Sequence, residues 1–134
     1  MQRDDAFAPF TGKHFLVLDD EFLIGSDMQQ ILENAGARSV AYANTVDDAH
    51  AILQKGGPLD LAVLDLFLGR ERQNSLGIAE ILTKRKIPIV FITGATGDDA
   101  HRERFPNVPV LVKPYHESEF IAVVRGALRR RSSD

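Results

Sequence analysis

Cysteine is absent from the chain, and its absence excludes disulfide bonds, thiolate metal sites and a cysteine nucleophile. The sequence also lacks a long apolar run of membrane-spanning length. Residues 1–12 carry acidic side chains instead of a signal-peptide pattern. We therefore expect a cytoplasmic protein that does not insert into a membrane, and the lack of cysteine fits a reducing compartment.

A strong excess of one charge is also missing. The 134 residues include 16 basic and 19 acidic side chains, for a net charge of -3, so no overall field attracts nucleic acid. The three arginines at 129–131 end the last predicted helix, where the helix dipole favours cations, and we interpret them as a solvated helix end. Metal-ligand spacing is absent among the histidines, which are His14, His50, His101 and His116.

The remaining composition is that of one soluble domain, with 44% hydrophobic and 26% charged residues. Residues 1–12 show no periodicity and predict an N-terminal extension, although Phe7 and Phe10 are able to dock on the fold. Residues 13–131 predict the domain, and residues 132–134 predict a C-terminal tail.

Strand and helix patterns alternate along this domain. Apolar runs predict buried strands at 15–18, 61–66, 87–92 and 108–112, and a weaker run predicts an edge strand at 39–43. The intervening helices are predicted from Phe22 to Gly36, from a Thr45 cap to Gly56, at 76–86, at 98–104 (short and polar), and up to 129–131. Five strand-then-helix units predict an α/β fold with a parallel sheet covered on both faces.

Polar residues follow the predicted strands at the edge where ligands of such sheets bind. The stretch VLDDEF places three acids in a row directly after the first strand. Carboxylates suit a hard cation, while hydroxyl and ammonium groups suit phosphoryl oxygens, so the set predicts phosphoryl transfer. The residues at the strand ends are Asp19, Asp20, Glu21, Asp65, Thr93 and Lys113.

Among the acids, Asp65 is the candidate nucleophile because it stands alone at the end of a central strand. Asp19 and Asp20 are expected to hold a divalent ion. We interpret Glu21 as an acid at the start of the first helix and leave it out of the metal site.

The motifs VLDDE, VLDL, FITG and LVKP, in this order and on these strand ends, resemble the receiver domain of two-component response regulators, the family of the chemotaxis receiver. The resemblance covers residues 13–131. It implies a doubly wound, five-stranded parallel sheet of the flavodoxin-like (βα)5 type, with strand order 2-1-3-4-5.

The resemblance also implies roles at individual positions. Asp20 matches the direct Mg²⁺ ligand, and Asp19 matches a neighbour that acts through water. Asp65 matches the phosphoacceptor and a further metal ligand. Phe67 occupies the position whose backbone carbonyl binds the metal.

Three further positions match the phosphoryl pocket of the family. Thr93 matches the switch hydroxyl that bonds a phosphoryl oxygen, and Gly94 matches the small residue that leaves room for the phosphoryl group. Lys113 matches the lysine that pairs with this group, and the bond from Lys113 to Pro114 is expected to be cis.

Two positions depart from the family pattern. Val110 stands where the family usually has an aromatic switch residue, which puts the usual output mechanism in doubt. Gly69 replaces a common proline and opens a polar loop over residues 70–75. Both features resemble stand-alone, stress-signalling receivers that lack the aromatic switch.

The predicted function is a single-domain response regulator that takes a phosphoryl group on Asp65 from a histidine kinase or histidine phosphotransfer protein, with Mg²⁺, and signals by protein-protein contact. We expect the protein not to be an enzyme, apart from slow removal of its own phosphoryl group. A homodimer formed through the fourth helix and fifth strand is left open. Alternatives are a constitutive interaction module, which Val110 motivates, and a phosphoryl sink or shuttle. A free-standing phosphatase is disfavoured because Phe67 stands where a DxDxT-type enzyme has its second aspartate.

Overall fold

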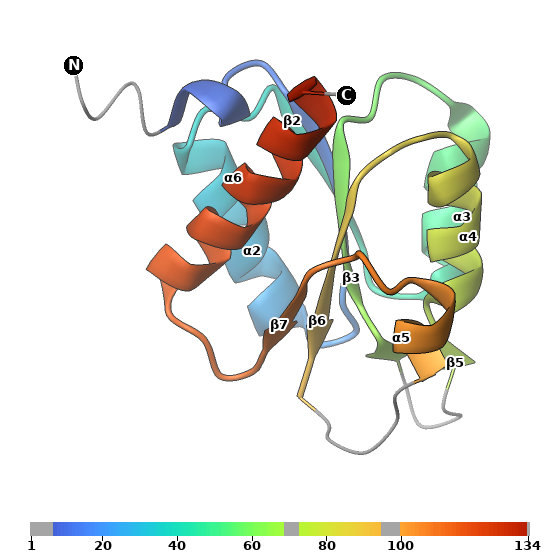
Figure 1. The fold of residues 1–134 in the computed structure, drawn as a ribbon. Coiled ribbons are helices and arrows are strands. Elements are labelled where there is room, and N and C mark those ends of the chain that lie inside the picture. The colour runs from blue at the N-terminus through green and yellow to red at the C-terminus, as the bar shows by residue number, and fades with distance from the viewer. Residues whose placement is uncertain (1–6, 69–72, 95–99, 134) are drawn as a thin grey trace.

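A five-stranded parallel sheet forms the centre of the protein, as the computed structural model of residues 7–68, 73–94 and 100–133 shows (Figure 1). Its strands are β1 (His14–Leu18), β2 (Ser39–Ala43), β3 (Leu61–Asp65), β6 (Ile89–Thr93) and β7 (Val110–Val112). They lie in the order β2-β1-β3-β6-β7, and every neighbouring pair is parallel. Counted along these five strands, this is the predicted order 2-1-3-4-5, and the predicted fold class is confirmed.

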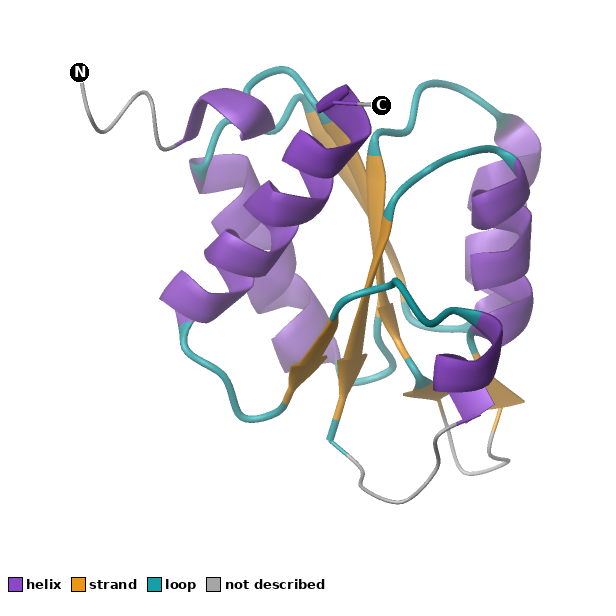
Figure 2. Ribbon diagram, viewed as in Figure 1, coloured by secondary structure: helices purple, strands orange, loops and turns teal. Residues whose placement is uncertain are grey.

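Helices cover both faces of the sheet (Figure 2). Helices α2 (Phe22–Asn34) and α6 (Glu117–Ser133) lie on one face, and α3 (Val46–Lys55), α4 (Leu76–Lys84) and α5 (Ala100–Arg104) lie on the other. Each face has its own apolar cluster. Among the helices of the described ranges, none combines the length and apolar character that a bilayer-spanning segment needs.

The two apolar clusters follow from alternation along the buried strands. In β1, Phe15 and Val17 pack toward α2 and α6, while Leu16 and Leu18 pack toward α3 and α4. Successive side chains of a strand point to opposite faces, so a central strand covered on both sides is apolar throughout. All five residues of β3 are buried, including the carboxylate that ends the strand, Asp65.

Helix boundaries agree with the predicted caps to within a few residues. Thr45 is the N-cap of α3, and its hydroxyl accepts a hydrogen bond from the Asp48 N–H at 3.0 Å. Gly56, with φ +75°, ends this helix. The predicted helix at 76–86 ends earlier, at Lys84, because Lys86 takes a left-handed conformation with φ +62°.

The N-terminal extension contributes to the core. A 3-10 helix, η1 (Ala8–Phe10), places Phe10 in the apolar cluster with no exposed surface, and η1 contacts α6. The Phe10 ring lies 6.2 Å from the Phe15 ring, and Phe7 meets Phe10 edge-on at 6.2 Å. The docking of Phe7 and Phe10 on the fold is confirmed, so the core begins before the predicted boundary at residue 13.

A short hairpin interrupts the segment predicted as a polar loop. Strands β4 (Phe67–Leu68) and β5 (Gln73–Asn74) pair antiparallel directly after β3. The prediction of a continuous loop at 70–75 was therefore wrong for residues 73–74, which pair with the segment after Asp65. Gly69 and residues 70–72 lie outside the described residues.

Helix α5 is short, as its polar sequence predicted, and residues 98 and 99 of the predicted helix lie outside the described residues. His101, within α5, and Phe105, directly after it, pack on the sheet. His101 is buried and meets the Phe91 ring edge-on at 5.8 Å, and Phe105 meets the same ring at 5.8 Å. Val110 is half-buried opposite Phe91 in the β6–β7 register.

We predict that Phe10→Ala lowers the free energy of unfolding by about 3–5 kcal/mol, because it opens a cavity in a filled core. The matched control is Phe22→Ala. Phe22 is 65% exposed, and its ring meets that of Tyr42 edge-on, so its removal should cost about 1 kcal/mol or less. Urea unfolding of both variants measures the difference. Equal losses would show that Phe10 does not belong to the core.

Candidate functional site at the carboxyl ends of the strands

The predicted site residues meet at the carboxyl edge of the sheet because the strands end level with one another. Leu18 of β1 pairs with Leu64 of β3, which brings Asp19 beside Asp65. Thr93 ends β6 and pairs with Val112 of β7, so Lys113 follows at the same height. The Lys113 N–H donates to the Thr93 carbonyl at 2.8 Å and continues this pairing beyond the strand.

Four carboxylates converge at this edge. Asp19, Asp20, Glu21 and Asp65 each offer an oxygen, and these oxygens lie within 4.8 Å of one another. Asp19 and Asp65 are buried, whereas Asp20 and Glu21 are exposed. The cluster thus has a buried floor and a solvent-facing side.

Lys113 supplies the positive charge inside this cluster. Its ammonium lies 2.9 Å from Glu21 Oε1, 3.1 Å from Asp65 Oδ2 and 3.3 Å from Asp19 Oδ2. It donates hydrogen bonds to Glu21 and Asp65. One ammonium therefore partly balances three carboxylates, and the cluster keeps a negative charge.

The pKa values of these groups follow from their surroundings. Burial raises the pKa of Asp19, and the Glu21 N–H and the Lys113 ammonium oppose this only in part. Burial by itself would lower the pKa of Lys113. The hydrogen bond to Glu21 and the charges of Asp65 and Asp19 outweigh it and raise this pKa above its ordinary value.

The residues present fit a hard divalent cation. Asp19 Oδ2 is buried and has no hydrogen-bond donor within the described residues, and its contact with Lys113 is an ion pair at 3.3 Å. A buried carboxylate oxygen without a hydrogen bond is costly unless a cation accompanies it. The cluster offers carboxylate oxygens, which Mg²⁺ prefers.

The other predicted positions surround this cluster. Thr93 is buried at the end of β6, and the bond between Lys113 and Pro114 is cis, as expected. A Cβ added at Gly94 would meet the Lys113 side chain at 3.7 Å, an ordinary contact, so the protein alone does not demand glycine there. Phe67 begins β4 two residues after Asp65, and the metal-binding role of its carbonyl stays a prediction.

Glu21 occupies the N-cap of α2, in agreement with its interpretation as a helix-start acid, and its carboxylate also lies in the acid cluster. Within the described residues, however, its carboxylate accepts no capping hydrogen bond and reaches Lys113 instead. Its position directly after two acids was the available signal, but the direction of its side chain depends on a turn in which the Glu21 N–H donates to Asp19 Oδ1 at 2.8 Å.

Tyr42 is a second residue that sequence reasoning missed. Its hydroxyl donates to the Asp19 carbonyl at 2.7 Å and so supports the acidic turn from the neighbouring strand β2. Burial raises the pKa of Tyr42, and the charges of Asp19 and Asp20 raise it further. A Cβ on Gly25 would overlap the Tyr42 ring, so this α2 glycine makes room for the contact.

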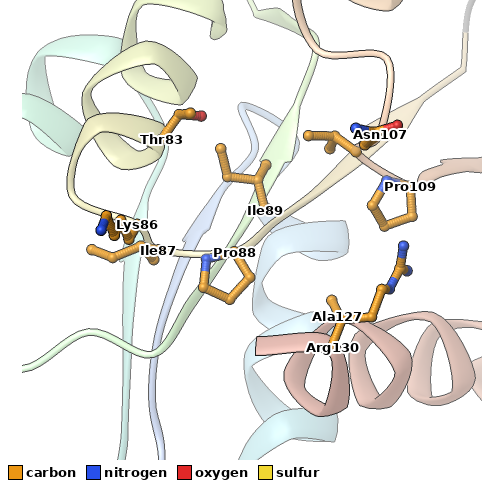
Figure 3. A pocket seen from close by; sticks show the side chains of 10 residues that line it. Thr83, Lys86, Ile87, Pro88, Ile89, Asn107, Pro109, Ala127 and Arg130 are labelled. Carbon is orange, nitrogen blue, oxygen red and sulfur yellow. The ribbon is translucent and has the colours of Figure 1, made fainter. Parts of the chain in front are cut away.

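A separate cavity of about 620 Å³ lies at the opposite edge of the sheet (Figure 3). Pro88, Ile89 and Pro109, which line it, stand at the amino ends of β6 and β7. Thr93 and Lys113 stand at the carboxyl ends of the same strands, so this cavity is no part of the acidic site.

The response regulator receiver domain family matches residues 15–125, which include every site residue described above. The chain belongs to this family. Receiver domains accept a phosphoryl group as their general function, and they typically use Mg²⁺ in an acidic pocket. In this receiver domain, an acid cluster with Lys113 inside it lies within the matched residues.

Three relatives give the extent of the similarity. Regulatory protein VirG of Agrobacterium fabrum is 29% identical over 90% of this chain and 48% of VirG. The phyllosphere-induced regulator PhyR of Methylorubrum extorquens is 25% identical over 84% of this chain and 42% of PhyR. The solution structure of SdrG from Sphingomonas melonis Fr1 is 36% identical, with a TM-score of 0.71, over 90% of this chain and 97% of that one. The chain spans about half the length of the curated relatives it matches.

We predict that the protein loses stability at alkaline pH as Tyr115 ionises. The Tyr115 ring stacks on the Phe120 ring at 5.9 Å beside the site. Burial, followed by the charge of Asp19, raises its pKa from 10.0 to about 12. Because the folded pKa exceeds the unfolded one, the stabilisation is intact below pH 10 and is lost as the pH rises toward 12.

The chain has two tyrosines, so Tyr42→Phe leaves Tyr115 as the only phenol to titrate. Its ultraviolet absorbance should change with a midpoint near 12 in the native protein and near 10 in urea. Circular dichroism at each pH identifies any prior unfolding. A native midpoint near 10 would contradict the prediction.

Proposed function

We propose that this receiver domain accepts a phosphoryl group on Asp65 from a histidine of a kinase or phosphotransfer protein and transmits the signal by contact with another protein. The contact between Lys113 Nζ and Asp65 Oδ2, at 3.1 Å beside the acid cluster, carries the proposal. It places a nucleophilic carboxylate, a cation for the phosphoryl group and candidate metal ligands in one site.

In the proposed step, an Asp65 carboxylate oxygen attacks phosphorus and forms the O–P bond of an acyl phosphate. The P–N bond of the donor phosphohistidine breaks, and the imidazole leaves with the electron pair and takes up a proton. Lys113 pairs with the phosphoryl oxygens. A Mg²⁺ ion held by Asp19, Asp20 and Asp65 would screen the repulsion between the attacking carboxylate and the phosphoryl group.

Thr93 is the candidate link from the phosphoryl group to the rest of the domain. Its hydroxyl is suited to bond a phosphoryl oxygen, and its carbonyl already accepts the Lys113 N–H at 2.8 Å. Movement at Thr93 would therefore act on β7. The same strand pair carries Phe91, on which His101 and Phe105 of the α5 region pack.

Exposed apolar side chains beside the site support a protein as the phosphoryl donor. Phe22 and Leu23 are largely exposed at the start of α2, directly after the acid cluster, and Val112 is exposed directly before Lys113. Such side chains at the mouth of a pocket suit a transient docking surface.

A constitutive interaction module is the second candidate, and the half-buried Val110 favours it because no aromatic ring at this position can couple to Thr93. The two candidates differ in whether Asp65 takes up a phosphoryl group. In the leading proposal the domain is a switch and not an enzyme, with at most slow hydrolysis of its own acyl phosphate.

We predict that acetyl phosphate with Mg²⁺ adds one phosphoryl group to the wild-type protein, as measured by intact mass. Asp65→Asn should abolish the addition, because an amide is no nucleophile for phosphorus, and chelation of Mg²⁺ should reduce it strongly. The matched control is Asp60→Asn. Asp60 precedes the same strand at its opposite end, where its side chain accepts the His14 N–H at 2.8 Å.

Wild type and Asp60→Asn should be modified alike. If wild type takes up no phosphoryl group, or if Asp65→Asn is modified equally, the proposed function is wrong and the constitutive module is favoured.

A further inference from the structure

Glu21 makes a contact that the general chemistry of the site does not require. It stands at the N-cap of α2 in extended conformation, where a side chain ordinarily accepts a backbone N–H of the first turn. Within the described residues the Glu21 carboxylate makes no such bond and instead accepts a hydrogen bond from Lys113 at 2.9 Å.

The backbone holds Glu21 in this position. Its N–H donates to Asp19 Oδ1 at 2.8 Å, and the carbonyl of Asp19 accepts the Tyr42 hydroxyl at 2.7 Å. Asp19 has no exposed side-chain surface, so the turn before Glu21 is anchored in the protein interior. The Glu21 carboxylate therefore approaches Lys113 from a fixed point.

Glu21 and the two buried acids that contact Lys113 differ in their exposure to solvent. The side chain of Glu21 is 58% exposed, whereas those of Asp65 and Asp19 are 6% and 0% exposed. The shortest of the three ion pairs is the exposed one, at 2.9 Å against 3.1 and 3.3 Å. The ammonium is thus held between the buried acids and one carboxylate on the solvent side.

Addition of a phosphoryl group to Asp65 changes the anionic groups with which the Lys113 ammonium pairs. The Asp65 carboxylate becomes an acyl phosphate, whose negative charge moves outward onto the phosphoryl oxygens. Lys113 has three N–H donors, and it already directs hydrogen bonds to Glu21 and Asp65. While Glu21 holds one of these donors and shares the ammonium charge, fewer donors and less of that charge are left for the phosphoryl oxygens.

We propose that Glu21 is a positioning residue that retains Lys113 in the unphosphorylated domain and competes with the phosphoryl group for its ammonium. The inference rests on the proposed function of Asp65 and Lys113. It assigns Glu21 two opposite effects: its charge favours Mg²⁺ in the cluster, and its hold on Lys113 slows phosphorylation.

The test compares Glu21→Gln with wild type in two measurements. Calorimetric titration with Mg²⁺ should show a roughly fivefold to tenfold weaker affinity, because one negative charge near the ion is lost. Phosphorylation by acetyl phosphate at saturating Mg²⁺, followed by intact mass, should become about threefold faster because a repelling charge is removed and Lys113 is released. A variant that merely damaged the site would lower both quantities.

Two further variants separate contact from charge. Glu21→Asp keeps the charge but is one methylene too short for the 2.9 Å contact, so it should keep most of the Mg²⁺ affinity while phosphorylation still accelerates. Glu33→Gln is the matched control for net charge. Glu33 is exposed on the same helix α2, about 18 Å from Glu21 along the helix axis. Its substitution should leave both the Mg²⁺ affinity and the rate of phosphorylation unchanged.

The outcomes distinguish this inference from the proposed function. If wild type takes up no phosphoryl group, the proposed function fails, and the role of Glu21 fails with it. If wild type is phosphorylated and Glu21→Gln is equally fast or slower, the role of Glu21 is overturned and the proposed function stands. Equal changes in Glu33→Gln would also overturn it, because they would be an effect of net charge.

Discussion

The ammonium of Lys113 is the positive charge that allows three carboxylates to converge at one edge of the sheet. Asp19 and Asp65 are buried, and buried anions without a partner are costly. The ion pairs at 2.9 to 3.3 Å offset that cost, but a single positive charge leaves the cluster anionic. This remaining negative charge has the sign that would attract a divalent cation to the cluster.

The sheet supplies the precision that this arrangement needs. Lys113 and Asp65 are 48 residues apart in the chain, and two strand pairings bring them together. Core packing on both faces fixes the register of the buried strands, since a shift by one residue would exchange the side chains of the two faces and disrupt the close packing of both clusters. The position of the ammonium therefore depends on side chains such as Phe91 and Leu64, far from any solvent.

Connections between the site and the rest of the fold run through backbone groups. The Tyr42 hydroxyl holds the Asp19 carbonyl from the edge strand β2, and the Thr93 carbonyl accepts the Lys113 N–H. On the face of β6 that carries Phe91, His101 and Phe105 pack on the Phe91 ring and attach the α5 region to the sheet. With Val110 in place of an aromatic residue on β7, these two rings are the aromatic contacts through which α5 meets the central strands within the described residues.

Most of the architecture could be predicted because it depends on local patterns. Apolar runs marked all five strands of the main sheet, the Thr45 and Gly56 signals marked α3, and each predicted site residue stood directly after or within a strand end. The β4–β5 pairing was missed because strands of two residues are too short to show a periodicity. The burial of Phe10 could be raised only as a possibility, since nothing local shows what an isolated apolar side chain will meet.

By itself, the sequence determined the order of strands and helices and the identity of the acids, hydroxyl and lysine at one edge, because strand ends follow from hydrophobic periodicity. Only the tertiary structure decided which carboxylates share Lys113. The direction of the Glu21 side chain depends on the turn after β1, on the Glu21 N–H bond to Asp19 and on the height of β7 relative to β3. Those are long-range constraints, and no pattern along the chain encodes a distance between residues 21 and 113.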